Sequence, residues 1–171
     1  MSTKQKTIKN SISLSGVGLH TGKKATVTFK AAPENHGFVF QRVDIEGQPT
    51  IKADCDLVVD TSRGTTIEQH GAKVHTTEHL LAAAYGLEID NLLIEINGPE
   101  VPILDGSAHF FLQALKDAGI EDQEAEKNYF VVEENITYED LDRMTEMLAV
   151  PQDEFRLTVM VDYNSPTLGT Q

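Results

Sequence analysis

Cysteine and tryptophan are nearly missing from this sequence, which has one cysteine, Cys55, and no tryptophan. A single cysteine cannot form a disulfide within the chain, which excludes a secreted scaffold held together by disulfides. The reducing cytoplasm is therefore the expected location. Because lone cysteines usually pack as small hydrophobic side chains, we also expect Cys55 to be buried.

Positive charge is scarce as well. The 171 residues include 14 lysines and arginines against 27 aspartates and glutamates, which gives a formal net charge of -13. Nucleic-acid binding depends on a basic surface that neutralises phosphates. Nucleic acid is therefore not an expected partner.

Long apolar runs are also absent. A membrane-spanning helix needs about 20 apolar residues, and the longest apolar segment, "LLAAAYGL" at 80–87, is much shorter. Serines and glycines interrupt "ISLSGVGL" at 12–19, so it lacks the apolar core of about 7–15 residues that a signal peptide requires. We expect a soluble globular protein without an export signal or a transmembrane segment, which suits a composition of 40% hydrophobic and 24% charged residues.

The periodicity of apolar residues predicts strands first and helices later. Strands are expected at 7–14, 24–31, 38–45 and 50–59, and a further strand at 91–97. One helix is expected from about Thr76 to Tyr85, with Gly86 at its C-terminal end. Strands followed by two helices that frame a strand predict an α+β fold.

The second predicted helix covers "AHFFLQALKDAGI" at 108–120, with Ser107 as its N-cap and Gly119 at its end. Its apolar face is expected to bury Phe110, Phe111 and Leu115. The acidic segment 121–128 is interpreted as a linker. Two more strands are expected at 129–140 and 155–166, with the charged "EDLDRMTE" as a solvated turn between them.

The segment "HTTEH" at 75–79 brings His75, Glu78 and His79 together within five positions. On a helix the two histidines would share a face and could bind one zinc ion, which is the H-x-x-E-H pattern of inverted zincin proteases. Thr76 and Thr77 favour a helix N-cap, however, so His75 can also lie before the first turn. Since a catalytic zinc takes three protein ligands, His79 alone does not complete a site.

Three ordered blocks surround and follow this motif: "SGVGLHTGKKATVTF", "VHTTEHLLAAAYGLEIDNLLIEINGPEVPILDGSA" and "FRLTVMVDYNSP". Together they resemble the UDP-3-O-acyl-N-acetylglucosamine deacetylases, zinc amidases of lipid A synthesis. The resemblance implies two similar α+β domains, each a sheet packed on a pair of helices (ribosomal protein S5 domain 2-like), with the active site between them. Residues 1–126 are then the expected first domain, and 127–171 the opening strands of an incomplete second one.

Residue by residue, the resemblance implies that His79 is a zinc ligand and that Glu78 is the general base. The family's other two ligands, a histidine and an aspartate, belong to the second domain and have no matching motif in these 171 residues. The chain alone is therefore expected to be inactive and to require the remainder of its second domain. His20, in "GVGLHTG", and Ser62 and Arg63, in "VDTSRGTTI", correspond to positions near the substrate, although some members have apolar residues at the last two.

The implied reaction is hydrolysis of the N-acetyl group of UDP-3-O-(3-hydroxyacyl)-N-acetylglucosamine, a UDP-linked acylated glucosamine, with Zn2+ as cofactor. It is the committed step of lipid A biosynthesis. Some members of the family are fused to a 3-hydroxyacyl-acyl-carrier-protein dehydratase, which makes a multifunctional enzyme one expectation. Two alternatives stay open: an inverted zincin protease fragment that binds zinc through both His75 and His79, and a non-enzymatic binding domain of the same fold.

Overall fold

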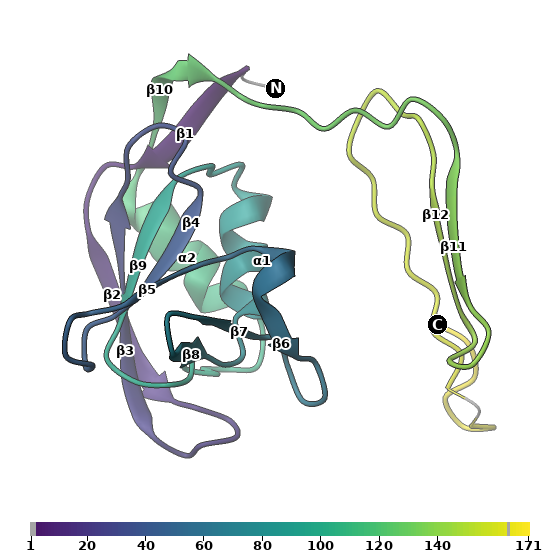
Figure 1. Ribbon diagram of the computed structural model, residues 1–171, viewed down its shortest axis with the longest axis horizontal. Helices are drawn as coiled ribbons and strands as arrows, with labels where there is room; N and C mark the ends of the chain where they lie inside the picture. Colours follow the sequence, from purple (N-terminus) through teal and green to yellow (C-terminus); the bar gives the residue numbers. More distant parts are fainter. Residues whose placement is uncertain (1–2, 164) are drawn as a thin grey trace. The chain divides into compact units, whose positions relative to one another are not determined.

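The computed structural model describes residues 3–163 and 165–171, and the chain divides into two units, Met1–Lys127 and Asn128–Gln171. The first unit carries both helices (Figure 1). The buried hydrophobic cluster of the described residues also lies in this unit. Among the described residues, neither helix has the length and the apolar character needed to cross a membrane.

A five-stranded sheet in the order β2-β3-β9-β4-β5 forms the centre of the first unit. The strands are β2 Ile12–Val17, β3 Lys24–Ala31, β9 Leu92–Ile96, β4 Phe38–Arg42 and β5 Thr50–Lys52. Neighbouring strands are antiparallel except β4 and β9, which are parallel. Alternation in the sequence explains the two faces, because Val27 and Phe29 are fully buried while hydroxyl pairs of 2.8 Å join β2 and β3 on the other face.

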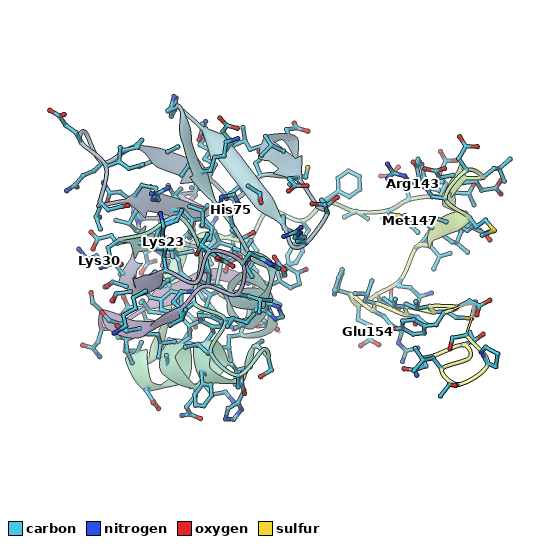
Figure 2. The ribbon with its side chains drawn as sticks, turned by 90° about the horizontal axis from the view of Figure 1, so that it is seen from below. Lys23, Lys30, His75, Arg143, Met147 and Glu154 are labelled. Atoms are coloured by element: carbon cyan, nitrogen blue, oxygen red, sulfur yellow. The ribbon has the colours of Figure 1, made fainter. Side chains whose placement is uncertain are left out.

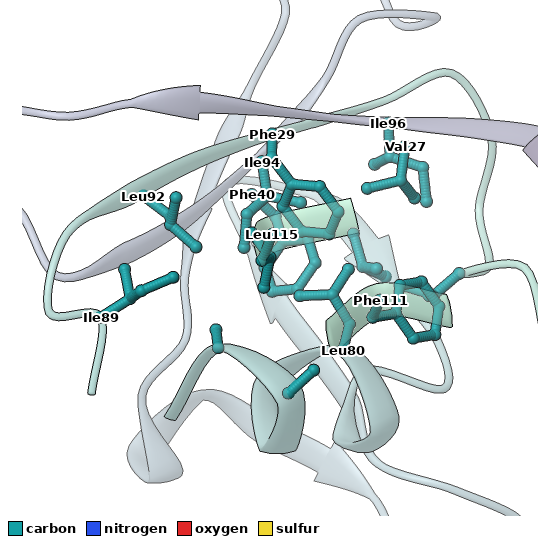
Figure 3. Close-up of a cluster of buried hydrophobic side chains, with 14 of the residues drawn as sticks. Val27, Phe29, Phe40, Leu80, Ile89, Leu92, Ile94, Ile96, Phe111 and Leu115 are labelled. Atoms are coloured by element: carbon teal, nitrogen blue, oxygen red, sulfur yellow. The ribbon is translucent and has the colours of Figure 1, made fainter. Parts of the chain in front are cut away.

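Two helices, α1 Glu78–Gly86 and α2 His109–Ala118, cover the apolar face of this sheet. Figure 3 shows Leu80 of α1 and Phe111 and Leu115 of α2 packed toward Phe29 and Ile94 of the sheet. All five side chains are fully buried. A mixed sheet packed on a helix pair confirms the predicted α+β class.

The end of α2 at Gly119 agrees with the sequence-based prediction, but the predicted N-cap was wrong: Ala108 is the N-cap residue and makes no side-chain cap bond, because the helix begins one residue later than a Ser107 cap requires. The Ser107 hydroxyl accepts a hydrogen bond from the His109 N–H at 3.1 Å, and Gly119 takes a left-handed conformation (φ 74°) directly after the helix. Phe111 and Leu115 are buried as expected, but Phe110 is 46% exposed. The prediction for Phe110 was wrong because successive helical residues project about 100° apart, so Phe110 points away from the face that holds Phe111.

Helix α1 begins two residues later than predicted, at Glu78. Thr76 cannot be helical because its φ is +59°, and Thr77 is the residue that precedes the first turn. At the other end Gly86 is the last helical residue, and the left-handed conformation falls on Glu88 (φ 57°). The start of α1 is therefore set by a turn at Thr76 and not by the apolar pattern.

Two smaller sheets complete the first unit. Strands β1 Lys4–Ile8 and β10 Ile120–Glu126 form an antiparallel ribbon, and β6 Val58–Asp60, β7 Thr66–Gln69 and β8 Ala72–Val74 form a three-stranded sheet after the 3-10 turn Cys55–Leu57. The predicted strand 7–14 is thus two strands, and 50–59 is divided between β5 and β6. Cys55 is exposed in the 3-10 turn, so its expected burial was wrong.

Strand β10 replaces the linker predicted at 121–128. Its acidic residues lie opposite the lysines of β1, with Lys6 paired with Asp122 and Lys4 with Glu126 in the strand register. The Lys4 and Glu126 side chains form an ion pair of 2.8 Å. Charge complementarity across two strands is not visible when the acidic segment is read alone, and for this reason the prediction failed.

In the described part of the second unit, β11 Ile136–Asp140 and β12 Thr145–Ala149 form a hairpin. Figure 2 labels Arg143 in its turn and Met147 on β12. Of the strand predicted at 129–140, only β11 forms. The second predicted strand, at 155–166, is not formed in its described part, where only Asp162 takes part in β pairing, through an isolated bridge with Thr170. Asn164 lies outside the described residues. Apolar residues such as Phe155, 73% exposed, have no sheet to join, and isolated strands are not stable.

Candidate metal and catalytic site

The first turn of α1 carries the two residues to which the sequence assigns chemistry, Glu78 and His79, and both are half-buried. Thr77, which precedes the helix, is fully buried and directs its backbone N–H and its hydroxyl to the carbonyl oxygen of Thr65, each at 3.2 Å. These bonds join the helix start to the loop between β6 and β7. A helix N-terminus favours negative charge, which suits the Glu78 carboxylate.

The Glu78 carboxylate is held by the same loop. The Thr65 N–H donates to Glu78 Oε2 at 2.9 Å. Gly64 has a φ of +151°, and a Cβ added there would lie 3.0 Å from Glu78 Oε1. The loop therefore fixes the carboxylate by one hydrogen bond and by a close approach that favours glycine.

The His79 ring makes no hydrogen bond or ion pair with any residue in the described ranges 3–163 and 165–171. Its nitrogens are therefore available to a metal ion, and imidazole is a good ligand for zinc. Across those same ranges, the one group of three metal-ligating side chains within 4.8 Å of one another is Asp54, Cys55 and Asp56, exposed at the 3-10 turn. His79 thus fits a zinc site as a single ligand that needs others.

His75 lies before the helix, within the body of the first unit (Figure 2), and is half-buried. Its backbone forms an isolated parallel bridge with Glu100, and its ring Nδ1 lies 2.9 Å from the hydroxyl of Thr66. Because His75 is outside α1, it does not share a helix face with His79. The two-histidine arrangement of an inverted zincin is not formed.

The side chains of His20, Ser62 and Arg63 are exposed. His20 lies on the loop between β2 and β3, and Ser62 and Arg63 lie on the loop between β6 and β7, which also contacts the start of α1. The His20 ring nitrogen Nε2 lies 2.8 Å from the carbonyl oxygen of Arg63. Ser62 donates its N–H to Asp60 Oδ1 at 3.0 Å, and this bond, with others from Ser62 and Thr61, lowers the pKa of the Asp60 carboxyl. The structure therefore brings the three predicted positions together. The contact between the two loops is made by the His20 ring and the main-chain carbonyl of Arg63.

A small cavity of about 150 Å³ lies between these loops. It is lined by His20, Thr21, Asp60, Arg63, Gly64, Thr66, His75 and Thr76. Two of these residues are near the start of α1: Gly64 approaches the Glu78 carboxylate, and Thr76 lies two residues before the helix. The cavity therefore adjoins the segment that carries Glu78.

Glu100 is the residue of this region that sequence reasoning missed. It is 1% exposed, and its carboxylate accepts hydrogen bonds from the loop of His20 and from Thr76. Burial alone would raise the pKa of Glu100, but the hydrogen bonds from His20, Thr21 and Thr76 outweigh it and lower the pKa to about 2. The available signal was a lone acidic residue in the otherwise apolar segment "GPEVPIL", which is typical of a buried carboxylate with hydrogen-bond partners.

Comparison with known proteins identifies the family. Residues 5–171 match the family of UDP-3-O-acyl N-acetylglycosamine deacetylase (LpxC). The chain belongs to this deacetylase family. It is 54% identical over 167 residues to the bifunctional enzyme LpxC/FabZ of Chlorobaculum tepidum and 49% identical over 168 residues to that of Bacteroides thetaiotaomicron, in each case over 98% of the chain and 36% of the relative.

Deacetylases without the second activity in their name are also similar. The UDP-3-O-acyl-N-acetylglucosamine deacetylase of Myxococcus xanthus is 41% identical over 167 residues, which is 98% of the chain and 52% of that relative. The chain thus spans about half the length of this deacetylase and about a third of the length of the two bifunctional relatives.

Proposed function

We propose that this chain is the first part of a zinc-dependent deacetylase that hydrolyses the N-acetyl group of UDP-3-O-(3-hydroxyacyl)-N-acetylglucosamine, releasing acetate and a free amine. The observation that carries this proposal is the position of Glu78 and His79 on the first turn of α1 in a chain of the deacetylase family. We further propose that the first unit has the S5 domain 2-like packing and that the enzyme is cytoplasmic.

In this proposal His79 binds the metal and Glu78 acts as the general base. A bound zinc ion would lower the pKa of water and polarise the amide carbonyl. The Glu78 carboxylate takes the proton from the attacking water, and the Thr65 N–H at 2.9 Å keeps Oε2 in place while this happens. His20, Ser62 and Arg63, which meet beside the cavity, are proposed to contact the UDP-sugar substrate.

Residues outside this chain are proposed to supply the other zinc ligands. A catalytic zinc takes three protein ligands, and within residues 3–163 and 165–171 His79 belongs to no group of three metal-ligating side chains. The similarity to the bifunctional enzymes of C. tepidum and B. thetaiotaomicron supports a further proposal, that this chain derives from such a fused enzyme.

The zinc content of three variants tests these roles in a protein that continues this chain to the length of its relatives. We expect His79→Ala to lose both zinc and activity, and Glu78→Gln to lose activity while it keeps zinc. His75→Ala should keep its zinc, because His75 lies outside α1 and is bonded to Thr66. Equal zinc loss in the Glu78 and His79 variants would contradict the division of roles, and zinc loss in the His75 variant would favour the inverted zincin alternative.

A further inference from the structure

Glu100 is a charged residue deep in the first unit to which the proposed reaction assigns no role. It follows β9 in the segment Gly98–Glu100 and is 1% exposed. A buried carboxylate is costly unless hydrogen bonds compensate for the lost water. Each of its oxygens does accept hydrogen bonds, and the donors come from two separate segments of the chain.

The first segment is the loop that carries His20. The His20 N–H donates to Glu100 Oε1 at 3.0 Å, and the Thr21 N–H donates to Oε2 at 2.7 Å. Gly18 makes room for the carboxylate, because a Cβ at this position would lie 2.7 Å from Glu100 Cδ. Two backbone donors converge on one carboxylate, so its position determines the conformation of this loop.

The second segment is the turn that leads into α1. The Thr76 hydroxyl donates to Glu100 Oε1 at 3.0 Å. Thr76 is buried and has a φ of +59°, a strained conformation for a β-branched residue that persists only when its surroundings hold it. His75, directly before it, is bonded by its N–H to the Pro99 oxygen at 2.9 Å and by its oxygen to the Val101 N–H at 3.1 Å.

Both segments continue into the candidate site. Beyond the first, the His20 ring contacts the Arg63 carbonyl at 2.8 Å. Beyond the second, Thr77 and Glu78 are bonded to Thr65 in the same loop. Buried Glu100 therefore connects the His20 loop with the turn that leads into α1, because it accepts hydrogen bonds from both.

We propose that Glu100 is a positioning residue of the deacetylase site, which sets the His20 loop and the Thr76 turn relative to each other and so places His20 and Glu78 for the reaction. This inference rests on the proposed function for its catalytic part. The lowered pKa of Glu100 agrees with it, because a carboxylate that stays ionised can hold its donors at any physiological pH.

The structural part is tested by NMR on the chain Met1–Gln171. Charge-assisted hydrogen bonds are short and strong, so the His20 and Thr21 amide protons should be shifted downfield and protected from exchange. In Glu100→Gln both effects should be lost. Thr7→Val is the matched control, since it also removes a buried group with two hydrogen bonds, to Asn91 and Ala32, at the opposite end of β9. Unchanged His20 and Thr21 signals in folded Glu100→Gln would overturn the proposal.

The catalytic part is tested in a zinc-loaded protein continued to the length of its relatives. We expect Glu100→Gln to lower kcat/KM by about 10- to 100-fold, without loss of zinc, whereas Thr7→Val loses stability but little activity. Thr76→Val removes only the hydroxyl that reaches Glu100 and should lower kcat/KM in the same direction, which covers the case in which Glu100→Gln fails to fold.

The outcomes separate the two proposals. An active wild type with a Glu100→Gln or Thr76→Val variant no more impaired than Thr7→Val overturns the positioning role and leaves the deacetylase function standing. A wild type that releases no acetate overturns the proposed function. In that case the NMR comparison still decides whether Glu100 joins the His20 loop to the Thr76 turn.

Discussion

Glu78 owes its position to contacts made by one short loop. The loop supplies the Thr65 N–H that bonds the Glu78 carboxylate and the Thr65 carbonyl that accepts two bonds from Thr77. Gly64 allows the close approach on the other side of the carboxylate. At the scale of residues, the proposed base therefore depends on the backbone of the loop between β6 and β7.

Substitution of Gly64 tests this dependence. In Gly64→Ala, a Cβ 3.0 Å from Glu78 Oε1 would displace the carboxylate, and the φ of +151° is unfavourable for alanine. We expect a loss of stability of about 1–3 kcal/mol in urea unfolding and a fall in the rate of acetate release. Gly71→Ala is the control, because Gly71 also has a positive φ (+75°) but has open space around it. Equal rates for the two variants would contradict the proposed contact.

Glu100 should make stability depend on acid. Its pKa is about 2 in the folded chain against an ordinary value of 4.5, so the unfolded chain takes up the proton first. The stabilisation is therefore complete above the ordinary value and is lost as the pH falls toward 2. We expect the difference in unfolding free energy between wild type and Glu100→Gln to shrink by roughly 3 kcal/mol as the pH falls from 4.5 to about 2. Urea unfolding at several pH values measures it, and a difference independent of pH would count against the prediction.

At the scale of elements, the sequence predicts an element well where its own pattern determines it. Strands β3 and β9 alternate clearly, and α2 is followed directly by a glycine. Prediction from the sequence fails where the structure of an element depends on a partner that is distant in the sequence. Strand β10 depends on the lysines of β1, and the start of α1 depends on the strained Thr76 and on Glu100. Within the site, the motif predicted Glu78 and His79 on one helix, and the threonines at 76 and 77 allowed for His75 before the first turn, where the structure has it.

The turn before α2 offers a test at this scale. Ser107→Ala removes the hydroxyl that accepts the His109 N–H at 3.1 Å. We expect the variant to lose about 0.5–1.5 kcal/mol of stability, the usual net contribution of one hydrogen bond. Ser11→Ala, at an exposed serine between β1 and β2, should change stability much less. Thermal unfolding followed by circular dichroism compares them, and equal midpoints would show that the Ser107 hydroxyl does not stabilise the start of α2.

At the scale of the whole molecule, the two units differ in how completely each buries its apolar residues. Every residue of the buried hydrophobic cluster falls between Ile8 and Ala118, in the first unit. In the second unit, large apolar side chains such as Phe130 and Met144 are 89% and 93% exposed. The first unit thus has the core that an independent domain needs, and the second has none of that kind among its described residues.

We therefore expect a chain that ends at Lys127 to fold by itself. Lys127 is held by Asp90 at 2.8 Å, so this cut leaves the β1 and β10 ribbon intact. Its cooperative unfolding transition should have the same midpoint as that of the chain Met1–Gln171, measured by circular dichroism during heating. A shortened chain without a cooperative transition would mean that residues 128–171 are required for the core.

The release of acetate from UDP-3-O-(3-hydroxyacyl)-N-acetylglucosamine is the most direct measurement of the central claim. It requires the zinc-loaded protein that continues this chain to the length of its relatives, with Glu78→Gln as the matched variant. We predict acetate release by the wild type and a loss of at least about 10²-fold with Glu78→Gln at unchanged zinc content, as expected for a general base. No acetate from the wild type, or equal release by both proteins, would contradict the assignment and favour a non-enzymatic binding domain or a different catalytic residue.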